Sequence, residues 1–238
     1  MKLVHFSCID STNTYLKEHF NELEDMTFVS ADEQTAGRGR NNRVWKSENG
    51  RNLLFSLLLI NEEFFSLHKE LPILSAYSVL EVLRDDYGLN SVSIKWPNDV
   101  YVGDKKICGI LLEAVSTDKL ECLIIGIGLN VNQKVFNNDV LHEPTSLSLE
   151  LHKDIDINTI KEKIYQKITA NLTKVLMGHN FYKEISEVNY LLNKEVYALI
   201  NDEKKLIKVL GLNNDYSLIA EVDGKVTTLF VGEISFHV

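Results

Sequence analysis

The sequence predicts an α+β domain over residues 1–190 followed by a small β-barrel over residues 191–238. Of its 238 residues, 45% are hydrophobic and 25% are charged, which is ordinary for a soluble globular protein with a real core. Strand-like runs and helical stretches mix in the first part, so a mixed or antiparallel sheet with helices is expected. After about residue 190, short β-like runs follow one another between turns of Asn, Asp and Gly, which is typical of a small barrel.

Helices are expected where apolar residues recur at helical spacing. The first begins with Asp10 or Ser11 as its N-cap and runs to about Phe20. A second, over residues 69–87, has apolar residues nearly all round its axis, so it should be well buried. The remaining helical stretches cover residues 145–151, 158–178 and 181–191.

Strands are expected where short apolar runs lie between turn residues. Pro97 forces extended geometry on Trp96 and interrupts strand pairing, and Gly103-Asp104 is a two-residue hairpin signal. The expected strands of the first domain cover residues 2–9, 27–31, 52–60, 91–95, 100–102, 105–115 and 120–127. Those of the barrel cover residues 194–200, 204–211, 216–222 and 225–231.

Composition excludes several classes of function. The net charge of -9 argues against general nucleic-acid binding, which depends on contacts to phosphates. No apolar run reaches the roughly 18 residues that a membrane span needs, and the N-terminus lacks the features of a signal peptide. The cysteines, Cys8, Cys108 and Cys122, are odd in number and widely spaced, so we expect reduced thiols in a cytoplasmic protein and no permanently bound metal.

An arginine-rich segment is the most informative part of the chain. We call residues 37–45 the arginine loop; it contains Arg38, Arg40 and Arg43 and closes on Trp45. A local positive cluster on an acidic protein suggests a small anionic ligand. Arginine forks bind phosphate or carboxylate through two donors, and the face of an indole ring can cover an aromatic base.

Three further polar segments are expected near the ends of strands, at residues 95–99, 105–110 and 126–132. Irregular polar segments usually gather at one rim of a sheet, where ligands bind. Each segment alone is a weak signal, but their combination with the arginine loop predicts one ligand site.

Together these motifs resemble those of the biotin protein ligases, in the same order. The matching segments are Asp10-Ser11-Thr12-Asn13, residues 37–45, 95–99, 106–110 and 126–130, and the terminal Gly232-Glu233-Ile234-Ser235. The resemblance spans essentially the whole chain. It implies a catalytic domain related to class II aminoacyl-tRNA synthetases, followed by an SH3-like barrel. With the first motif at residue 10, the N-terminal DNA-binding domain of many family members is expected to be missing, and with it any binding of DNA.

The resemblance also implies a two-step reaction. Biotin and Mg·ATP would give biotinyl-5′-adenylate and pyrophosphate, and the adenylate would acylate one lysine of a biotin carboxyl carrier domain of acetyl-CoA carboxylase or a related carboxylase. Because a carboxylate must attack a phosphate, cationic donors and Mg²⁺ arriving with ATP have to offset the repulsion. The family includes monomers and dimers, which leaves a homodimer open.

The resemblance assigns roles to individual residues. Lys106, Arg40 and Asp99 would be catalytic, with Lys106 at the junction of the biotin carboxylate and the α-phosphate and Asp99 positioning the acceptor amine or Mg²⁺. The residues expected to bind biotin are Ser11, Thr12, Asn13, Gln34, Gly37, Arg38, Arg40, Lys106 and Gly109. Those expected to bind ATP are Arg38, Arg40, Arg43, Trp45, Asn98 and Asn130.

Simpler interpretations stay open for several of these residues. Lys106 could be a solvated lysine of a hairpin, Ser11 only a helix cap, Trp45 an anchor in the core, and Asp99 a turn residue. At the terminal strand, His237 stands where some family members have a basic residue, which leaves open a weaker contact to the arginine loop or the triphosphate.

Two other functions also compete with the ligase. Lipoate and octanoyl ligases or transferases share the fold, and some use a cysteine nucleophile near a lysine. Cys108 lies two residues after Lys106, so it would face the same side of a strand, where a thiolate could be activated. A non-catalytic nucleotide-binding module is the second alternative, and the acidity of the chain disfavours it where the partner is RNA.

Overall fold

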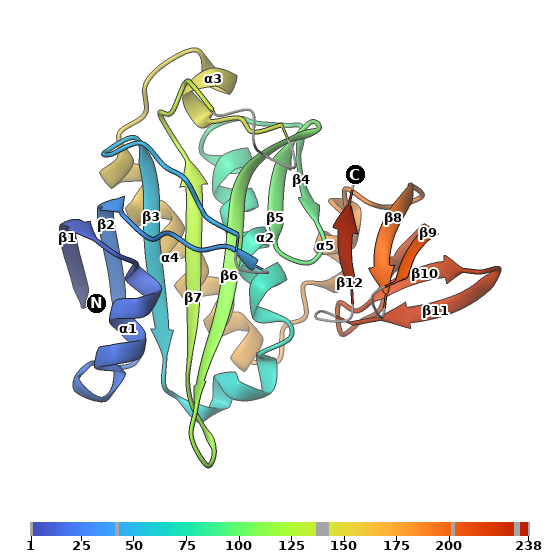
Figure 1. Ribbon diagram of the computed structural model, residues 1–238, viewed down its shortest axis with the longest axis horizontal. Helices are drawn as coiled ribbons and strands as arrows, with labels where there is room; N and C mark the ends of the chain where they lie inside the picture. The colour runs from blue at the N-terminus through green and yellow to red at the C-terminus, as the bar shows by residue number, and fades with distance from the viewer. Residues whose placement is uncertain (1, 41–42, 137–142, 201–202, 231–233, 238) are drawn as a thin grey trace.

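The computed structural model describes residues 2–40, 43–136, 143–200, 203–230 and 234–237. Two β-sheets organise this part of the chain (Figure 1). The larger sheet has seven strands in the order β1-β2-β3-β7-β6-β5-β4, and the smaller has five in the order β11-β10-β9-β8-β12. Helices accompany the larger sheet, so the predicted α+β class is confirmed.

The larger sheet is mixed. β1 pairs with β2 in parallel, and the chain crosses over between these two strands through α1 (Thr12–His19). All other neighbouring strands of this sheet pair antiparallel. Its strands are β1 (Leu3–Ile9), β2 (Phe28–Gln34), β3 (Asn52–Leu59), β4 (Val92–Lys95), β5 (Asp99–Val102), β6 (Lys105–Ser116) and β7 (Leu120–Asn130).

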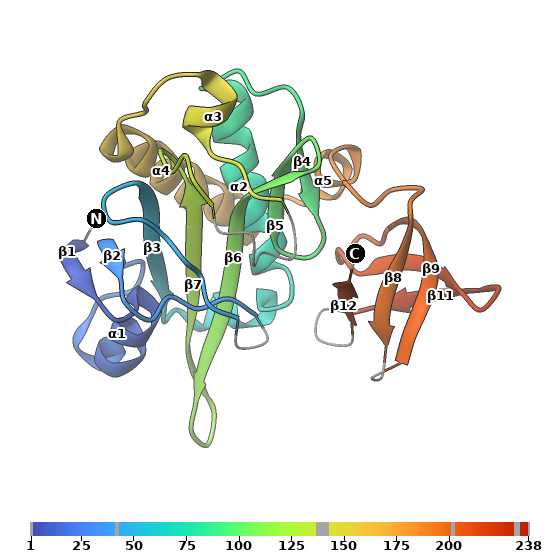
Figure 2. The same ribbon diagram turned by 45° about the horizontal axis from the view of Figure 1, so that its top comes forward.

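The two faces of this sheet are covered differently. α2 (Leu71–Asp85) and α4 (Ile157–Leu176) lie across one face, whereas α1 and the arginine loop lie over the other (Figures 1 and 2). The remaining helices are short: α3 (Leu147–Leu151), α5 (Tyr182–Glu187) and the 3-10 turns η1 (Phe20–Glu22) and η3 (Glu62–Leu67). None of the helices described is long and apolar enough to cross a membrane.

The main core lies between the sheet and α2 with α4. Leu57 of β3, Leu80 of α2 and Ile164 of α4 are completely buried there. As the periodicity predicts, nearly every residue of α2 is buried. A smaller cluster lies under α1 on the opposite face and contains Leu16, Val29, Leu58, Cys122 and Ile124. Because this second cluster is small, much of the sheet face on the α1 side is left free for a ligand.

Strand β7 extends further than the sequence predicts. The predicted strand covers residues 120–127. In the structure, Gly126 pairs with Ser56 of β3 on one side and Leu111 of β6 on the other, and pairing continues to Asn130. Hydrogen bonding from both neighbours carries the ladder through the glycines. The predicted helix at 181–191 is in turn shorter, ending at Glu187.

The smaller sheet is antiparallel throughout. It consists of β8 (Glu195–Ile200), β9 (Glu203–Leu212), β10 (Leu218–Val222), β11 (Lys225–Leu229) and β12 (Ile234–His237). Trp96 ties it to the larger sheet, because its indole Nε1–H donates to the carbonyl oxygen of Tyr216 at 2.8 Å. Of the terminal motif, Gly232 and Glu233 lie outside the described residues, and the open question of a contact from the His237 side chain falls outside them too.

Candidate active site

A cavity of about 600 Å³ opens on the α1 side of the larger sheet. It is bounded by the N-terminus of α1, the arginine loop, residues 95–99 and strands β6 and β7. The structure brings together all but one of the predicted site residues. Those that line this cavity are Ser11, Thr12, Asn13, Gln34, Arg38, Arg40, Arg43, Trp45, Asn98, Asp99, Lys106, Gly109 and Asn130.

Gly37 is the exception. It pairs with Trp45, whose backbone N–H donates to the Gly37 carbonyl at 2.9 Å. A Cβ at residue 37 would lie 2.7 Å from the Trp45 carbonyl oxygen. Glycine is therefore needed at this position to close the base of the arginine loop, whatever the ligand.

A cluster of uncharged polar side chains forms the end of the cavity at α1. Ser11 caps the helix, as predicted, and its hydroxyl accepts from the Thr14 N–H at 3.4 Å. The Thr12 backbone N–H donates to Gln34 Oε1 at 2.8 Å, which joins α1 to the end of β2. Ser11, Thr12 and Asn13 are all buried. This end can therefore bind a ligand that carries both hydrogen-bond donors and acceptors.

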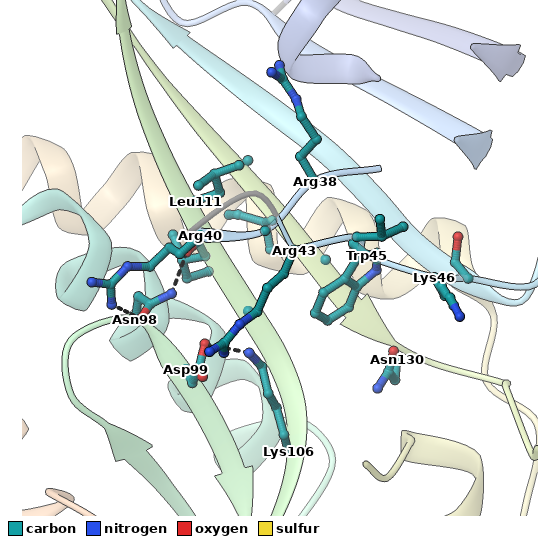
Figure 3. Close-up of a pocket in the computed structure, with 18 of the residues that line it drawn as sticks. Arg38, Arg40, Arg43, Trp45, Lys46, Asn98, Asp99, Lys106, Leu111 and Asn130 are labelled. Carbon is teal, nitrogen blue, oxygen red and sulfur yellow. Dashed lines mark hydrogen bonds and ion pairs between the residues drawn. The ribbon is translucent and has the colours of Figure 1, made fainter. Parts of the chain in front are cut away.

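An ion pair lies at the other end. The Lys106 ammonium is 2.7 Å from Asp99 Oδ1, and both side chains are largely buried (Figure 3). The interpretation of Lys106 as a solvated hairpin lysine is therefore wrong. Its neighbour Lys105 fits that description instead, because it is exposed and pairs with Glu143.

Two arginines of the loop add positive charge near this ion pair. The Arg40 guanidinium donates to Asn98 Oδ1 at 3.0 Å, and the Asn98 amide donates in turn to the Ile110 carbonyl. Burial lowers the pKa of Arg40, although the charge of Asp99 opposes the shift. Arg43 reaches from the loop toward Asp99 and Lys106 in Figure 3.

Lys95 is a cation of the site that the sequence analysis did not single out. Its side chain lines the cavity and only 5% of the residue is exposed. Burial lowers the pKa of Lys95 to about 8, while the charge of Asp99 acts in the opposite direction. The ammonium is thus still mostly protonated at pH 7. The only signal in the sequence is its place at the start of the 95–99 segment.

Trp45 forms one wall of the cavity by packing against glycines of two adjacent strands. A Cβ on Gly128 would lie 2.6 Å from Trp45 Cε2, and one on Gly109 would lie 3.1 Å from Cζ3. The ring therefore requires glycine at 128 and leaves little room for a side chain at 109. The Lys106 ammonium is 5.8 Å from the centre of the indole. A planar aromatic surface therefore borders the cationic end.

Arg38 points away from the cationic end, although part of it lines the cavity. Its guanidinium donates to Thr14 Oγ1 at 3.1 Å and lies 3.5 Å from Glu113 Oε2, on the α1 side (Figure 3). Asn130, at the opposite side, donates to the Thr145 carbonyl at 3.0 Å. In this arrangement Arg40 and Arg43, and not Arg38, are the arginines of the loop that reach the cationic end (Figure 3).

Cys108 does not share the face of Lys106, contrary to the expectation from strand alternation. The pairing of β5 with β6 shifts register between Val100 and Tyr101, opposite Lys106 and Cys108. This β-bulge leaves the Cys108 side chain completely buried in the core and brings the position of a Gly109 Cβ within 3.2 Å of Lys106 Nζ. Burial raises the pKa of the Cys108 thiol strongly, so it is not a nucleophile at neutral pH.

Alkylation tests this placement. Iodoacetamide is expected to modify Cys8, which is exposed, and to leave Cys108 and Cys122, which are buried, unmodified in the folded protein. Peptide mapping by mass spectrometry measures the modification, and biotin-dependent ATP–pyrophosphate exchange before and after treatment should be unchanged. Rapid alkylation of Cys108 with matching loss of activity would restore the thioester alternative.

The residues that could hold a metal ion are few. No group of three or more His, Cys, Asp or Glu suited to a metal occurs in the described part of the chain. Asp99 and Glu48 supply the carboxylates that line the cavity. Mg²⁺ commonly binds through one or two carboxylates together with substrate phosphates, and this donor set fits that mode.

Comparisons with known proteins agree with this geometry. The chain matches the Biotin/lipoate A/B protein ligase family over residues 5–130. Escherichia coli (strain K12) Bifunctional ligase/repressor BirA is 30% identical over 233 residues, covering 96% of this chain and 72% of that protein. Its Bacillus subtilis (strain 168) counterpart is 37% identical over 158 residues, covering 65% of this chain and 48% of that protein. Biotin protein ligase from Aquifex aeolicus, in complex with biotin and ATP, gives a TM-score of 0.88 at 33% identity, covering 99% of this chain and 98% of that one.

The fold and the site together define a class of α+β protein. Its members have a mixed sheet with a cationic, partly aromatic cavity over one face. The chain belongs to the biotin/lipoate A/B protein ligase family. The resemblance drawn from five short motifs and the terminal strand is thereby confirmed.

Proposed function

We propose that the chain is a biotin–protein ligase, which activates biotin with ATP and transfers the biotinyl group to a lysine of a carrier domain. One observation carries the proposal: a single cavity joins an uncharged polar end, built from Ser11, Thr12 and Gln34, to a cationic end around Lys106 and Arg40. The cyclic urea of biotin needs donors and acceptors, and a carboxylate meeting a triphosphate needs cations. The two ends therefore match the two ends of the reaction.

The first step joins two anions. An oxygen of the biotin carboxylate attacks the α-phosphorus of ATP, the bond from that phosphorus to the bridging oxygen breaks, and pyrophosphate leaves. We assign Lys106 to the junction of carboxylate and α-phosphate, with Arg40 and Arg43 on the phosphates and Lys95 adding charge nearby. Mg²⁺, arriving with ATP, would neutralise phosphate charge, and Asp99, the carboxylate at the cationic end, would hold it.

The second step transfers the acyl group. The neutral amine of the carrier lysine attacks the carbonyl carbon of biotinyl-5′-adenylate, the bond to AMP breaks, and the amine loses a proton as the amide forms. Asp99 and Asn98 lie at the cationic end, where this amine must arrive. A carboxylate there would attract the incoming lysine and orient it. The arginine loop would also shield the reactive anhydride from water.

The polar end of the cavity favours biotin over lipoate or octanoate. The acyl chains of those acids carry no groups that match Ser11, Thr12 or Gln34. A site built to hydrogen-bond a polar ligand rejects an analogue that lacks the polar groups, because buried donors and acceptors are left without partners. Discrimination of roughly 10⁴-fold is within reach of such a site.

Partners and domain organisation extend the proposal. We infer that residues 1–190 form the catalytic domain and residues 191–238 an SH3-like barrel, and that the acceptor is a biotin carboxyl carrier domain. The five antiparallel strands of the smaller sheet support the barrel. Trp96 of the 95–99 segment donates a hydrogen bond to Tyr216, which lies between β9 and β10 of the smaller sheet. A carrier docked on that sheet would therefore lie close to the site.

The direct test uses the full chain with biotin, Mg·ATP and a purified biotin carboxyl carrier domain. We expect ATP–pyrophosphate exchange that depends on biotin and a carrier lysine that gains one biotinyl group by mass spectrometry. Lipoate and octanoate serve as matched acids and should support neither reaction. Exchange with octanoate but not with biotin would overturn the assignment in favour of an acyl ligase of the same family.

A further inference from the structure

Glu113, in β6, is a carboxylate at which three elements meet outside the cavity. Its side chain is only 18% exposed. The Asn13 amide of α1 donates to its Oε2 at 2.7 Å, and Lys17 of the same helix lies 2.5 Å from Oε1. Arg38 of the arginine loop is 3.5 Å from Oε2. One side chain therefore contacts both the helix that begins at the polar end and the loop.

The carboxylate fixes the orientation of the Asn13 amide. An ionised carboxylate only accepts hydrogen bonds, so Asn13 must present Nδ2 to Glu113 and Oδ1 to the opposite side. There the Ser56 hydroxyl donates to Oδ1. A Cβ at Gly126 would lie 2.5 Å from Oδ1, so the glycine leaves room for this side chain.

The direction of bonding continues to Thr12. Ser56 has one hydroxyl proton and gives it to Asn13, so toward Thr12 Oγ1, 2.6 Å away, the Ser56 oxygen can only accept. Gln34 Oε1, which also can only accept, takes the Thr12 backbone N–H at 2.8 Å and the Thr12 hydroxyl at 2.9 Å. The single Thr12 hydroxyl proton is thus held within the cluster. Toward a ligand in the cavity that Thr12 lines, this oxygen can therefore only accept a hydrogen bond.

We propose that Glu113 is a positioning residue for biotin: acting through Asn13 and Ser56, it sets the Thr12 hydroxyl as the acceptor for an N–H of the cyclic urea. This inference rests on the proposed function and deepens it. Glu113 is ionised at neutral pH: burial alone would raise its pKa, but hydrogen bonds from Lys17 and Asn13 and nearby positive charges hold the pKa below its ordinary value. A neutral side chain would leave the direction of the chain of hydrogen bonds unspecified.

The test compares three variants of the full chain. Glu113→Leu removes the acceptor for Asn13 and is expected to raise the Kd for biotin about ten- to hundredfold, with the KM for ATP changed less than about twofold. Glu113→Gln retains one acceptor oxygen and should show a smaller rise. Lys17→Met removes an ion pair to the same carboxylate but keeps the acceptor for Asn13, so its Kd for biotin should rise less than that of Glu113→Leu. Calorimetry with biotin and steady-state pyrophosphate exchange give the two constants.

A biotin analogue methylated on the urea nitrogens distinguishes positioning of Thr12 from a purely structural role of Glu113. A purely structural role would not change the preference for biotin over this analogue. The parent protein should discriminate strongly against it, and the ratio of its Kd to that of biotin should shrink in Glu113→Leu. Equal rises in the constants for biotin and ATP, or a lowered Tm with unchanged affinity and discrimination, would overturn the proposal. If Glu113→Leu does not fold, Glu113→Gln carries the same comparison. A parent protein that binds no biotin at all would instead overturn the proposed function together with this inference.

Discussion

Replacing Lys106 with alanine is expected to slow formation of the adenylate by about 10²–10³-fold, the usual cost of losing one preorganised donor to a developing charge. The ammonium lies beside Asp99 at the cationic end of the cavity, where we propose that the biotin carboxylate and the α-phosphate meet. Its removal also leaves Asp99, only 15% exposed, without that ion-pair partner, which adds to the repulsion of the anionic substrates. Biotin-dependent ATP–pyrophosphate exchange measures the loss.

Lys105 provides a matched control for this variant. It is adjacent in sequence, carries the same charge, and pairs with Glu143 at the surface, where a single ion pair contributes little. Lys105→Ala should retain exchange within about twofold. Comparable losses in the two variants, or exchange by Lys106→Ala within about threefold of the parent, would show that general positive charge and not the placement of one ammonium drives the step.

Much of the site could be predicted because its residues belong to short, contiguous motifs. Ser11 precedes a helix and Arg40 lies in a loop between strands, so local signals locate them without knowledge of the tertiary structure. The strands could be predicted in the same way, because apolar residues recur with a different period in strands than in helices. A local pattern thus predicts that a helix or strand exists and where the polar segments next to it lie.

The rest depended on contacts between distant residues. The bulge that turns Cys108 into the core arises from pairing with β5, and no residue of β6 signals it. Glu113 contacts Asn13 across 100 positions of sequence, and on its own it resembles any charged residue of a half-exposed strand. Lys95 owes its lowered pKa to burial by the surrounding fold. Such features follow from packing, which a single sequence does not reveal.

Replacing either of the two glycines of β7, Gly126 or Gly128, is expected to have the second large effect on substrate binding. Gly128→Ala would place a methyl group 2.6 Å from the Trp45 indole, whereas Gly126→Ala would place one 2.5 Å from Asn13 Oδ1. Overpacking of this kind costs about 1–3 kcal/mol, or about five- to 150-fold in affinity if it falls on one ligand. Trp45 borders the cationic end, where we propose that ATP binds, and Asn13 lies at the polar end, where we propose that biotin binds. We therefore expect Gly128→Ala to raise the KM for ATP and Gly126→Ala to raise the KM for biotin.

A double-mutant cycle with Trp45 decides whether the Gly128 effect acts through the indole. Trp45→Ala empties the space into which the new methyl group would project, so Gly128→Ala should cost little further ATP affinity in that background, although each single variant is impaired. Thermal unfolding of all variants separates loss of the fold from loss of binding. If the effects of Gly128→Ala and Trp45→Ala on the KM for ATP were simply additive, or if Gly126→Ala and Gly128→Ala affected the two substrates alike, the division of the cavity into a biotin end and a nucleotide end would be wrong.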